Sequence, residues 1–431
     1  MTKDMTTIGE ITKVFDGPHA TPKKTEAGPY FLSISSLENG VLDLSKSAHL
    51  NEEDFLKWTK RVTPQENDLL FSYETRLGEA ALMKKGVKAC LGRRMGLLRP
   101  NTEVVLPKFL LYAYLSPAFQ EVIKANTIRG ATVDRIALTE LPDFKIRIPP
   151  IEEQNCVASI LSTLDAKIDL NNKINAELEA MAKTLYDYWF VQFDFPISKE
   201  QAKAMGKPHL EGKPYKTSGG KMVYDEILKR EIPEGWEGGY LDNLGQIVGG
   251  STPSTTVPEN FTKDGIPWLT PNDLSENTGN KFISKGNIDV TEVGMKSASL
   301  KNHPAGTVLL SSRAPIGYMA IARTDLTTNQ GFKSFVPNKG YTCEFIYYGI
   351  KNSLKSIVQN SSGSTFKEVS GTVLKTVKAI LPPIQLSELY SKKAGSIFQK
   401  QDCLELENTQ LIDHRDWLLP MLMNGQVKVH A

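Results

Sequence analysis

The pattern of apolar and polar positions divides the chain into short β-rich runs and two long helical segments. Runs such as residues 306–312 and 317–322 are bounded by Gly and Pro, which is typical of strands joined by tight turns. The segments from about 152 to 192 and from about 385 to 424 contain no Gly or Pro except Gly395 and Pro420. We therefore predict an α+β chain in which two β-rich regions are each followed by a long helix.

The order of these segments repeats along the chain. Residues 28–37 align without gaps with 265–274, and residues 148–151 align with 381–384 in the same order. Further matches join 130–136 to 363–369 and, with one residue gained or lost, 64–78 to 304–317. A repeat of this length indicates two copies of one structural unit. The predicted parts are a first β-rich domain at 1–148, a helix at 149–192, a connector at 193–235, a second β-rich domain at 236–381 and a helix at 382–431.

Both helical segments carry one heptad seam, placed in register by the repeat. Asn175 and Asn408 occupy equivalent positions, and a paired polar residue in an apolar seam fixes register. We predict that the helices pack as an antiparallel coiled-coil spacer, although an ordinary amphipathic surface helix remains the alternative. The predicted seam comprises Leu164, Asn171, Asn175, Leu178, Leu185, Ile397, Leu404, Asn408, Leu411 and Leu418.

Composition limits the class of protein. With 431 residues the chain needs more than one core, and 40% hydrophobic with 23% charged residues is ordinary for a soluble protein. Met1 to Glu10 lacks the apolar run of a signal peptide, and the apolar stretch from Phe109 to Leu115 is too short to cross a bilayer. The four cysteines are isolated from one another, which indicates neither a disulfide framework nor a metal site. We expect a cytoplasmic protein.

Several local motifs occur in an order that resembles the specificity subunits of type I restriction–modification systems. Residues 148–154 read Ile-Pro-Pro-Ile-Glu-Glu-Gln, and residues 184–190 read Thr-Leu-Tyr-Asp-Tyr-Trp-Phe. The connector at 213–223, followed by Glu-Ile-Pro-Glu-Gly-Trp at 231–236, also looks like this family's entry to a second recognition domain. The second copy departs from the pattern at 385–388, and its helix ends differently at 417–425, in a form that resembles the family's usual C-terminal ending.

The resemblance implies that each β-rich domain is a target-recognition domain that reads DNA. It further implies two modification subunits, which carry S-adenosylmethionine, and restriction–translocation subunits, which use ATP and Mg. The chain itself would hold no cofactor and no metal. A net charge of +2 is low for a protein that holds DNA by electrostatics alone, so the basic residues should be local or the partners should supply backbone contacts.

Motifs for catalysis are missing from the sequence. The two Pro-Pro pairs are flanked by apolar residues and lack the polar and aromatic residues with which a methyltransferase holds an extruded base. No phosphate-binding loop of the form Gly-x-x-x-x-Gly-Lys-Ser/Thr occurs, and the six histidines form no metal-binding motif. We therefore expect a non-catalytic recognition subunit, although degenerate nuclease motifs escape such a search. The alternative is a helical scaffold whose β-rich domains bind protein rather than DNA.

Candidate DNA-binding residues lie in loops beside glycine, where Arg, Lys, Asn, Gln, Ser and Thr can reach base edges or phosphates. The alternatives are a solvated arginine at Arg76 or Arg313, a strand-end turn at Asn329 and Gln330, and a structural turn at 129–132 or 362–365. The candidates in the first domain are His19, Thr21, Arg76, Arg93, Arg94, Arg129 and Thr132. Those in the second domain are Ser251, Thr252, Arg313, Asn329, Gln330, Lys333 and Thr365.

The two domains agree at scaffold positions but differ at these candidates, which predicts a target of two unlike half-sequences. At the end of the first helix, the apolar residues exceed what a two-helix seam can bury. We expect Tyr186, Trp189 and Phe190 to be exposed and to dock the modification subunits. Packing on the neighbouring recognition domain is the alternative.

Overall fold

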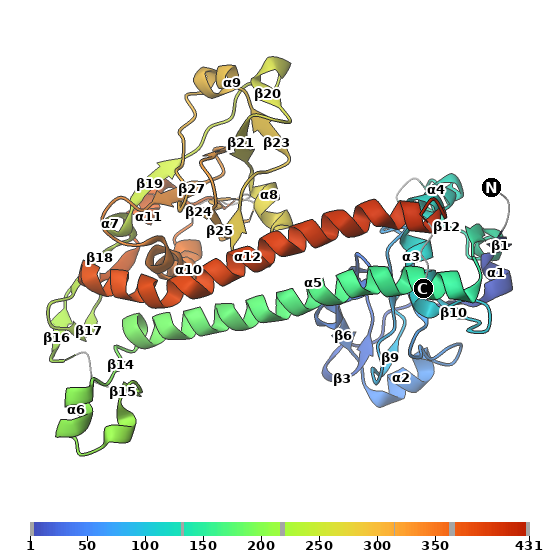
Figure 1. Cartoon of the computed structure of the whole chain (residues 1–431), viewed down its shortest axis with the longest axis horizontal. Coiled ribbons are helices and arrows are strands. Elements are labelled where there is room, and N and C mark those ends of the chain that lie inside the picture. The colour runs from blue at the N-terminus through green and yellow to red at the C-terminus, as the bar shows by residue number, and fades with distance from the viewer. Residues whose placement is uncertain (1–3, 131–132, 216–219, 314, 362–366, 428–431) are drawn as a thin grey trace. The chain divides into compact units, whose positions relative to one another are not determined.

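The computed structural model describes residues 4–130, 133–215, 220–313, 315–361 and 367–427. The chain forms two compact units, one of Met1–Leu170 with Thr409–Ala431 and one of Asn171–Asn408. Each unit contains one β-rich domain and one part of each long helix, α5 (Ile151–Tyr186) and α12 (Ile384–Met423), which Figure 1 shows in green and red. The predicted mixture of strands and long helices is confirmed. The exact domain boundaries and the coiled-coil packing stay predictions.

The first domain is built around a four-stranded antiparallel sheet in the order β2-β10-β7-β8. A second sheet has the order β6-β3-β9, and β1 pairs with β13 so that the two ends of the domain meet. Its strands are β1 (Met5–Thr7), β2 (Thr12–Asp16), β3 (Thr25–Phe31), β4 (Leu37–Glu38), β5 (Val41–Leu42), β6 (Ala48–His49), β7 (Leu69–Ser72), β8 (Ala80–Leu82), β9 (Ala89–Cys90), β10 (Met95–Pro100), β11 (Thr127–Ile128), β12 (Arg135–Ile136) and β13 (Lys145–Arg147). Its helices are α1 (Ile8–Ile11), α2 (Glu52–Trp58), α3 (Pro107–Leu115) and α4 (Pro117–Ala125).

The second domain repeats this plan with a five-stranded sheet, β19-β27-β24-β25-β22, and a four-stranded sheet, β20-β23-β21-β26. Its ends meet through β18 and β28, as those of the first domain meet through β1 and β13. Its strands are β18 (Glu237–Tyr240), β19 (Gln246–Gly249), β20 (Phe261–Thr262), β21 (Ile266–Leu269), β22 (Phe282–Ile283), β23 (Ile288–Val290), β24 (Val308–Leu310), β25 (Met319–Ala322), β26 (Thr327–Thr328), β27 (Lys333–Val336) and β28 (Lys378–Leu381). Its helices are α7 (Leu241–Leu244), α8 (Pro271–Glu276), α9 (Glu292–Ser297), α10 (Cys343–Gln359) and α11 (Gly371–Leu374).

The connector between α5 and the second domain has structure of its own. It contains β14 (Phe195–Pro196), α6 (Lys199–Ala204), β15 (Pro214–Tyr215) and the antiparallel pair β16 (Met222–Asp225) and β17 (Arg230–Pro233). Ser198 caps α6 by accepting a hydrogen bond from the backbone N–H of Gln201. Ile232 and Trp236 are buried in the core of the second unit, so the end of the connector is part of that unit.

Tyr186, Trp189 and Phe190 are buried, and the expectation that they are exposed was wrong. Their exposed fractions are 3%, 2% and 1%. The ring centroid of Phe190 lies 4.7 Å from that of Phe345 on α10, and Tyr186 lies against Phe345 as well. The second β-rich domain and the start of α12 cover the three rings, because a large aromatic gains more from packing against other rings than from facing water. The alternative, packing on the neighbouring domain, is the one observed.

A buried lysine joins the second domain to both long helices within the second unit. Lys281 Nζ lies 2.6 Å from Glu179 Oε2 on α5 and donates a hydrogen bond of 2.7 Å to Gln401 Oε1 on α12. The side chain of Lys281 is 3% exposed and sits 3.7 Å from the ring centre of Phe398. Burial raises the pKa of the Glu179 carboxyl, but attraction and hydrogen bonding from Lys281 and Lys351 outweigh burial and lower that pKa to about 2. The pair is therefore charged and is satisfied by several groups at once.

A smaller polar group joins the first domain to the helices in the same way. The hydroxyl of Tyr112 on α3 donates a 2.5 Å hydrogen bond to Asp165 on α5. Arg415 on α12 binds the other oxygen of the same carboxylate at 3.1 Å. Tyr348 on α10, in the matching segment of the second domain, donates to Glu179 at 3.0 Å. Both domains thus dock on α5 through a tyrosine and a carboxylate.

The residues of the predicted seam are all buried or half-buried. Asn171, Asn175, Leu404 and Asn408 are buried, and the remaining six are half-buried. In the second unit, Asn171 Nδ2 donates to Asn408 Oδ1 at 2.9 Å, and Asn408 Nδ2 donates to Asn172 Oδ1 at 2.8 Å. α5 and α12 therefore pair polar side chains at this level.

Among the described residues, no helix combines the length and the apolarity needed to cross a membrane.

We predict that Trp189→Ala destabilises the full chain by about 3–5 kcal/mol, because it removes a buried ring and leaves a cavity. Trp417→Ala is the matched control, since Trp417 is 59% exposed, and it should change the free energy of unfolding by less than about 0.5 kcal/mol. Urea unfolding followed by circular dichroism measures both. Equal stabilities of the two variants would contradict the burial of Trp189.

We also predict that Glu179→Gln destabilises the chain by about 3–5 kcal/mol at pH 7, because Lys281 stays buried without its closest carboxylate. The double variant Glu179→Gln with Lys281→Met should recover much of this loss. Since the folded-state pKa of Glu179 is about 2, its contribution is present above about pH 4.5 and is lost as the pH falls toward 2. Urea midpoints from pH 7 to pH 3 should therefore fall less steeply for Glu179→Gln than for the parent chain.

Candidate nucleic-acid interface

In the second domain, four predicted residues are brought together by two loops. The backbone N–H of Ser251 donates to the carbonyl of Thr328 at 3.0 Å, and the side chains of Thr252 and Gln330 are hydrogen-bonded to each other. A Cβ at Gly250 would lie 2.1 Å from the oxygen of Thr328, so glycine is what allows the loops to approach. Asn329 uses its side-chain oxygen to accept the backbone N–H of Gly331 at 2.8 Å. Asn329 therefore shapes the turn, in agreement with the alternative prediction of a strand-end turn.

Two cations accompany this pair of loops. Lys333, on β27, donates from Nζ to the carbonyl of Phe332 at 3.2 Å. Burial lowers the pKa of Lys333, Glu368 opposes that shift and Arg313 adds to it, so the three charged groups lie near one another. Arg313 also forms an isolated antiparallel bridge with Glu368. Thr365 lies outside the described residues.

In the first domain, the loop after β2 lies against the loop before β10. The backbone N–H of Gly17 donates to the carbonyl of Met95 at 2.8 Å, and a Cβ at Gly17 would lie 2.7 Å from the carbonyl oxygen of Gly92. The first loop carries His19 and Thr21, and the second carries Arg93; all three are exposed. The structure thus places these three predicted residues on neighbouring loops.

Two further predicted arginines are held by carboxylates. Arg94, with φ of 70°, places Nε 2.9 Å from Glu74, and Arg76 lies 3.1 Å from Glu79. Their side chains are 33% and 35% exposed, so both remain partly accessible. A carboxylate partner fixes the direction of a guanidinium, which restricts Arg76 and Arg94 to one orientation.

The hairpin formed by β11 and β12 lies beside the same part of the first domain. The backbone N–H of Thr75 donates to the carbonyl of Asp134 at 3.3 Å, and Glu74 forms a bridge with Arg135. Arg129, in the turn of this hairpin, is exposed. Thr132 lies outside the described residues. The loop after β2, the loop before β10 and the loop after β7 are thus linked by hydrogen bonds, and each carries a basic side chain.

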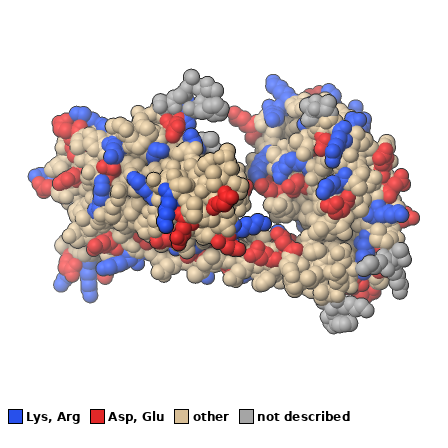
Figure 2. Space-filling model, turned by 90° about the horizontal axis from the view of Figure 1, so that it is seen from above, with Lys and Arg blue, Asp and Glu red and all other residues tan. Residues whose placement is uncertain are grey.

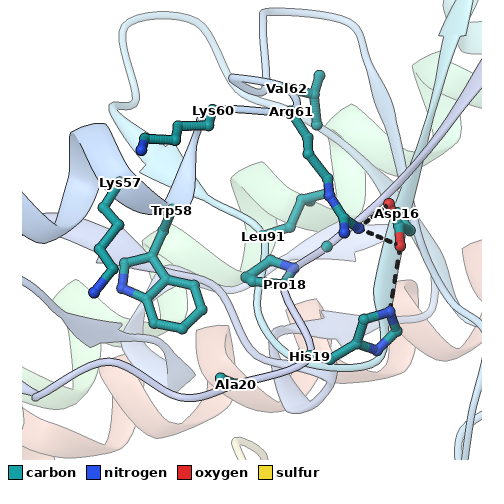
Figure 3. Close-up of a pocket in the computed structure, with 11 residues that line it drawn as sticks. Asp16, Pro18, His19, Ala20, Lys57, Trp58, Lys60, Arg61, Val62 and Leu91 are labelled. Carbon is teal, nitrogen blue, oxygen red and sulfur yellow. Dashed lines mark hydrogen bonds and ion pairs between the residues drawn. The ribbon is translucent and has the colours of Figure 1, made fainter.

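The sequence analysis missed a pocket beside His19. It has a volume of about 470 Å³ and lies between the loop after β2 and the end of α2, where Lys57, Trp58, Lys60 and Arg61 follow one another closely. Figure 3 shows Arg61 and His19 directed at Asp16, with Trp58 and Lys57 on the other side of the pocket in this view. A run of basic and aromatic residues at the end of a short helix was the available signal. The predicted candidates lie in loops that contain glycine, and this run contains none.

The charges do not form one large field of a single sign on the face that Figure 2 shows. Lys and Arg side chains are interspersed with Asp and Glu there, in keeping with the net charge of +2. Within the described ranges, no group of three or more His, Cys, Asp or Glu side chains could hold a metal ion. The arrangement suits recognition by individually placed side chains rather than by bulk electrostatics.

A family model described as the type I restriction modification DNA specificity domain matches residues 2–180 and 233–413. The chain belongs to this family. Its two matches cover the two recognition domains and parts of both long helices, which confirms the resemblance and the predicted duplication. As a specificity subunit it has a role in DNA recognition and is not itself catalytic. The protein-binding scaffold is not favoured.

Individual relatives agree with this assignment. The type I restriction enzyme HindI specificity subunit of Haemophilus influenzae is 29% identical over 370 residues, which are 77% of this chain and 80% of that protein. The type I restriction enzyme MjaIX specificity subunit of Methanocaldococcus jannaschii is 45% identical over 154 residues, 35% of each chain. The crystal structure of the type I restriction–modification S subunit from M. genitalium has a TM-score of 0.56 at 17% identity and covers 97% of this chain and 95% of that chain. That last comparison concerns the fold alone.

Proposed function

We propose that this specificity subunit reads a bipartite, asymmetric DNA target, with one half-sequence for each recognition domain. The observation that carries the proposal is the difference between corresponding loops. After β2 the first domain presents His19, whereas after β19 the second domain presents Ser251 and Thr252. Since different side chains match different base edges, two domains with one scaffold and different loops read different sequences.

The proposal extends to the partners that the family resemblance implies. Two modification subunits carrying S-adenosylmethionine would methylate the target, and restriction–translocation subunits using ATP and Mg would cleave DNA that lacks the methyl group. This chain supplies recognition and holds no cofactor of its own in the proposal. Its low net charge supports a division of labour in which partners add contacts to the DNA backbone.

The long helices act as the spacer between the two half-sequences in this proposal. α5 runs without interruption over 36 residues and α12 over 40. The hydrogen bonds of Asn171 and Asn408 support a fixed antiparallel register, because a shifted register would leave buried amides without partners. A coiled-coil spacer of fixed register would give the target a gap of fixed length.

Inserting one heptad after Leu170 in α5 and one before Thr409 in α12 should lengthen the gap and leave both half-sequences unchanged. Seven helical residues add about 10.5 Å, which corresponds to about three base pairs at 3.4 Å each. A paired heptad keeps the seam on the same face. A four-residue insertion beside Asn171 adds about one turn, or about 6 Å, and should move the preferred gap by one or two base pairs. Methylome sequencing measures the motif in each strain. An unchanged gap after the paired insertion would contradict the spacer model.

Because Trp189 is buried, we propose that the modification subunits dock instead on exposed apolar side chains of the two long helices. The candidates for this docking are the large apolar residues of α5 and α12 that are exposed to solvent, which are found in both compact units. They are Leu170, Met181, Ile384, Leu389, Leu406, Ile412 and Trp417. Burying such side chains against a partner is worth roughly 1.5–3 kcal/mol each, and charged residues would otherwise be expected on a helix face that stays in water.

We predict that Trp417→Ala weakens assembly with the modification subunit by about tenfold or more, because an exposed tryptophan at an interface is a frequent hot spot. Val293→Ala is the control, since Val293 is 63% exposed but lies on α9 of the second recognition domain. Titration of the labelled full chain with modification subunit measures both affinities. Equal affinities would exclude Trp417 from the interface.

A further inference from the structure

Arg61 differs from the other paired arginines of the first domain in being both fixed and exposed. Its Nη1 donates to the two oxygens of Asp16 at 2.8 and 2.7 Å, while its side chain is 63% exposed. By comparison Arg76, Arg94 and Arg99 are 35%, 33% and 30% exposed. Arg99 also holds the buried Asp68 with two nitrogens, which is a structural role. Arg61 is therefore anchored through one terminal nitrogen, while much of its side chain stays accessible.

The bonds to Asp16 use only one of the three nitrogens of the guanidinium. In the part of the chain that the structure describes, Nε and Nη2 of Arg61 have no partner. These two N–H groups form one straight edge of the guanidinium, and such an edge matches the O6 and N7 acceptors of guanine. Because Asp16 fixes the rotation of the group, less conformational entropy is lost when that edge binds.

The residues that line the pocket beside Arg61 are of the types that bind a DNA strand. Lys57 and Lys60 are exposed at its rim, and Pro18, Val62 and Leu91 contribute apolar surface. Trp58 lines the pocket while its other contacts are with the cluster around Phe55. Lysines pair with backbone phosphates, and apolar and aromatic surface packs against deoxyribose.

The matching place in the second domain is built differently. Counted from the helix caps Asn51 and Thr291, Trp58 corresponds to Ala298 and Arg61 to Lys301. The strand position equivalent to Asp16 is Gly249, the last residue of β19. The buttressed arginine and its pocket therefore belong to the first domain, as expected of a device that distinguishes one half-sequence from the other.

We propose that Arg61, held by Asp16, reads a guanine in the first half-sequence, while Lys57 and Lys60 bind phosphates of the same strand at the pocket. This inference rests on the proposed function. Asp16 acts here as a positioning residue, since it orients Arg61 and needs no contact with DNA. His19 lies 3.4 Å from Asp16 and completes the polar rim of the pocket.

The test compares full-length variants co-expressed with the modification subunit, read by methylome sequencing. Arg61→Lys keeps the charge but loses the two-pronged edge, and it should relax one guanine position of one half-sequence, with discrimination there falling on the order of ten- to a hundredfold. Asp16→Asn should relax the same position by a smaller factor. The other half-sequence should be unchanged in both variants.

The lysines have a separate signature. Lys57→Ala and Lys60→Ala should weaken binding of the assembled complex to a duplex about equally for all sequences, and each should reduce the salt dependence by about one phosphate contact. Lys124→Ala is the control, because Lys124 is 78% exposed on α4 and pairs with Glu121. It should leave both the motif and the salt dependence unchanged.

Two results would overturn the inference while leaving the proposed function intact. One is an unchanged motif in Arg61→Ala and Arg61→Lys, and the other is a uniform loss of methylation with no relaxed position, which would assign Arg61 to a phosphate. A parent complex that methylates no defined motif would instead overturn the proposed function, and this inference with it. Circular dichroism melting of each variant confirms that folding is unaffected.

Discussion

Each recognition domain of this specificity subunit has an apolar side that would face water if the long helices were removed. In the first unit that side packs on Val157 and Leu161 of α5 and on Leu422 and Met423 of α12. In the second it packs on Tyr186 and on the start of α12. The helices therefore supply part of the largest core of each unit, and neither of these cores is complete without them. This shared burial is the constraint from which the rest of the architecture follows.

Buried polar contacts fix the orientation of each domain on the long helices. An apolar surface alone tolerates small rotations, whereas Lys281 with Glu179 and Tyr112 with Asp165 are satisfied in one geometry. A domain that turned on its helices would leave a buried charge or hydroxyl without a partner. Such fixed docking suits a protein whose task is to present loops at a defined place on DNA, because a misplaced loop loses its base contacts.

The loops that present the candidate readers are held by backbone contacts and by carboxylates rather than by large apolar cores. Gly17 and Gly250 permit close approach of neighbouring loops, and Asp16 and Glu74 orient arginines. In the proposed mode of recognition, these glycine and acidic residues would contribute without touching DNA. Exchanging a loop residue can then alter the sequence read while the helices and domain cores stay the same.

Patterns along the chain were enough to predict the duplication, the two long helices and the family resemblance, because repeats, heptads and Pro-Pro turns can be recognised without the fold. They also singled out Ser251, Thr252 and Gln330 as candidates, since they lie in loops that contain glycine. The remaining features depend on how distant segments pack together. Whether Trp189 faces water depends on α10, more than 150 residues away, and the pairing of Arg61 with Asp16 joins residues 45 positions apart. A residue's type and spacing reveal what it can bond, but its partner is chosen by packing between segments that no local pattern connects.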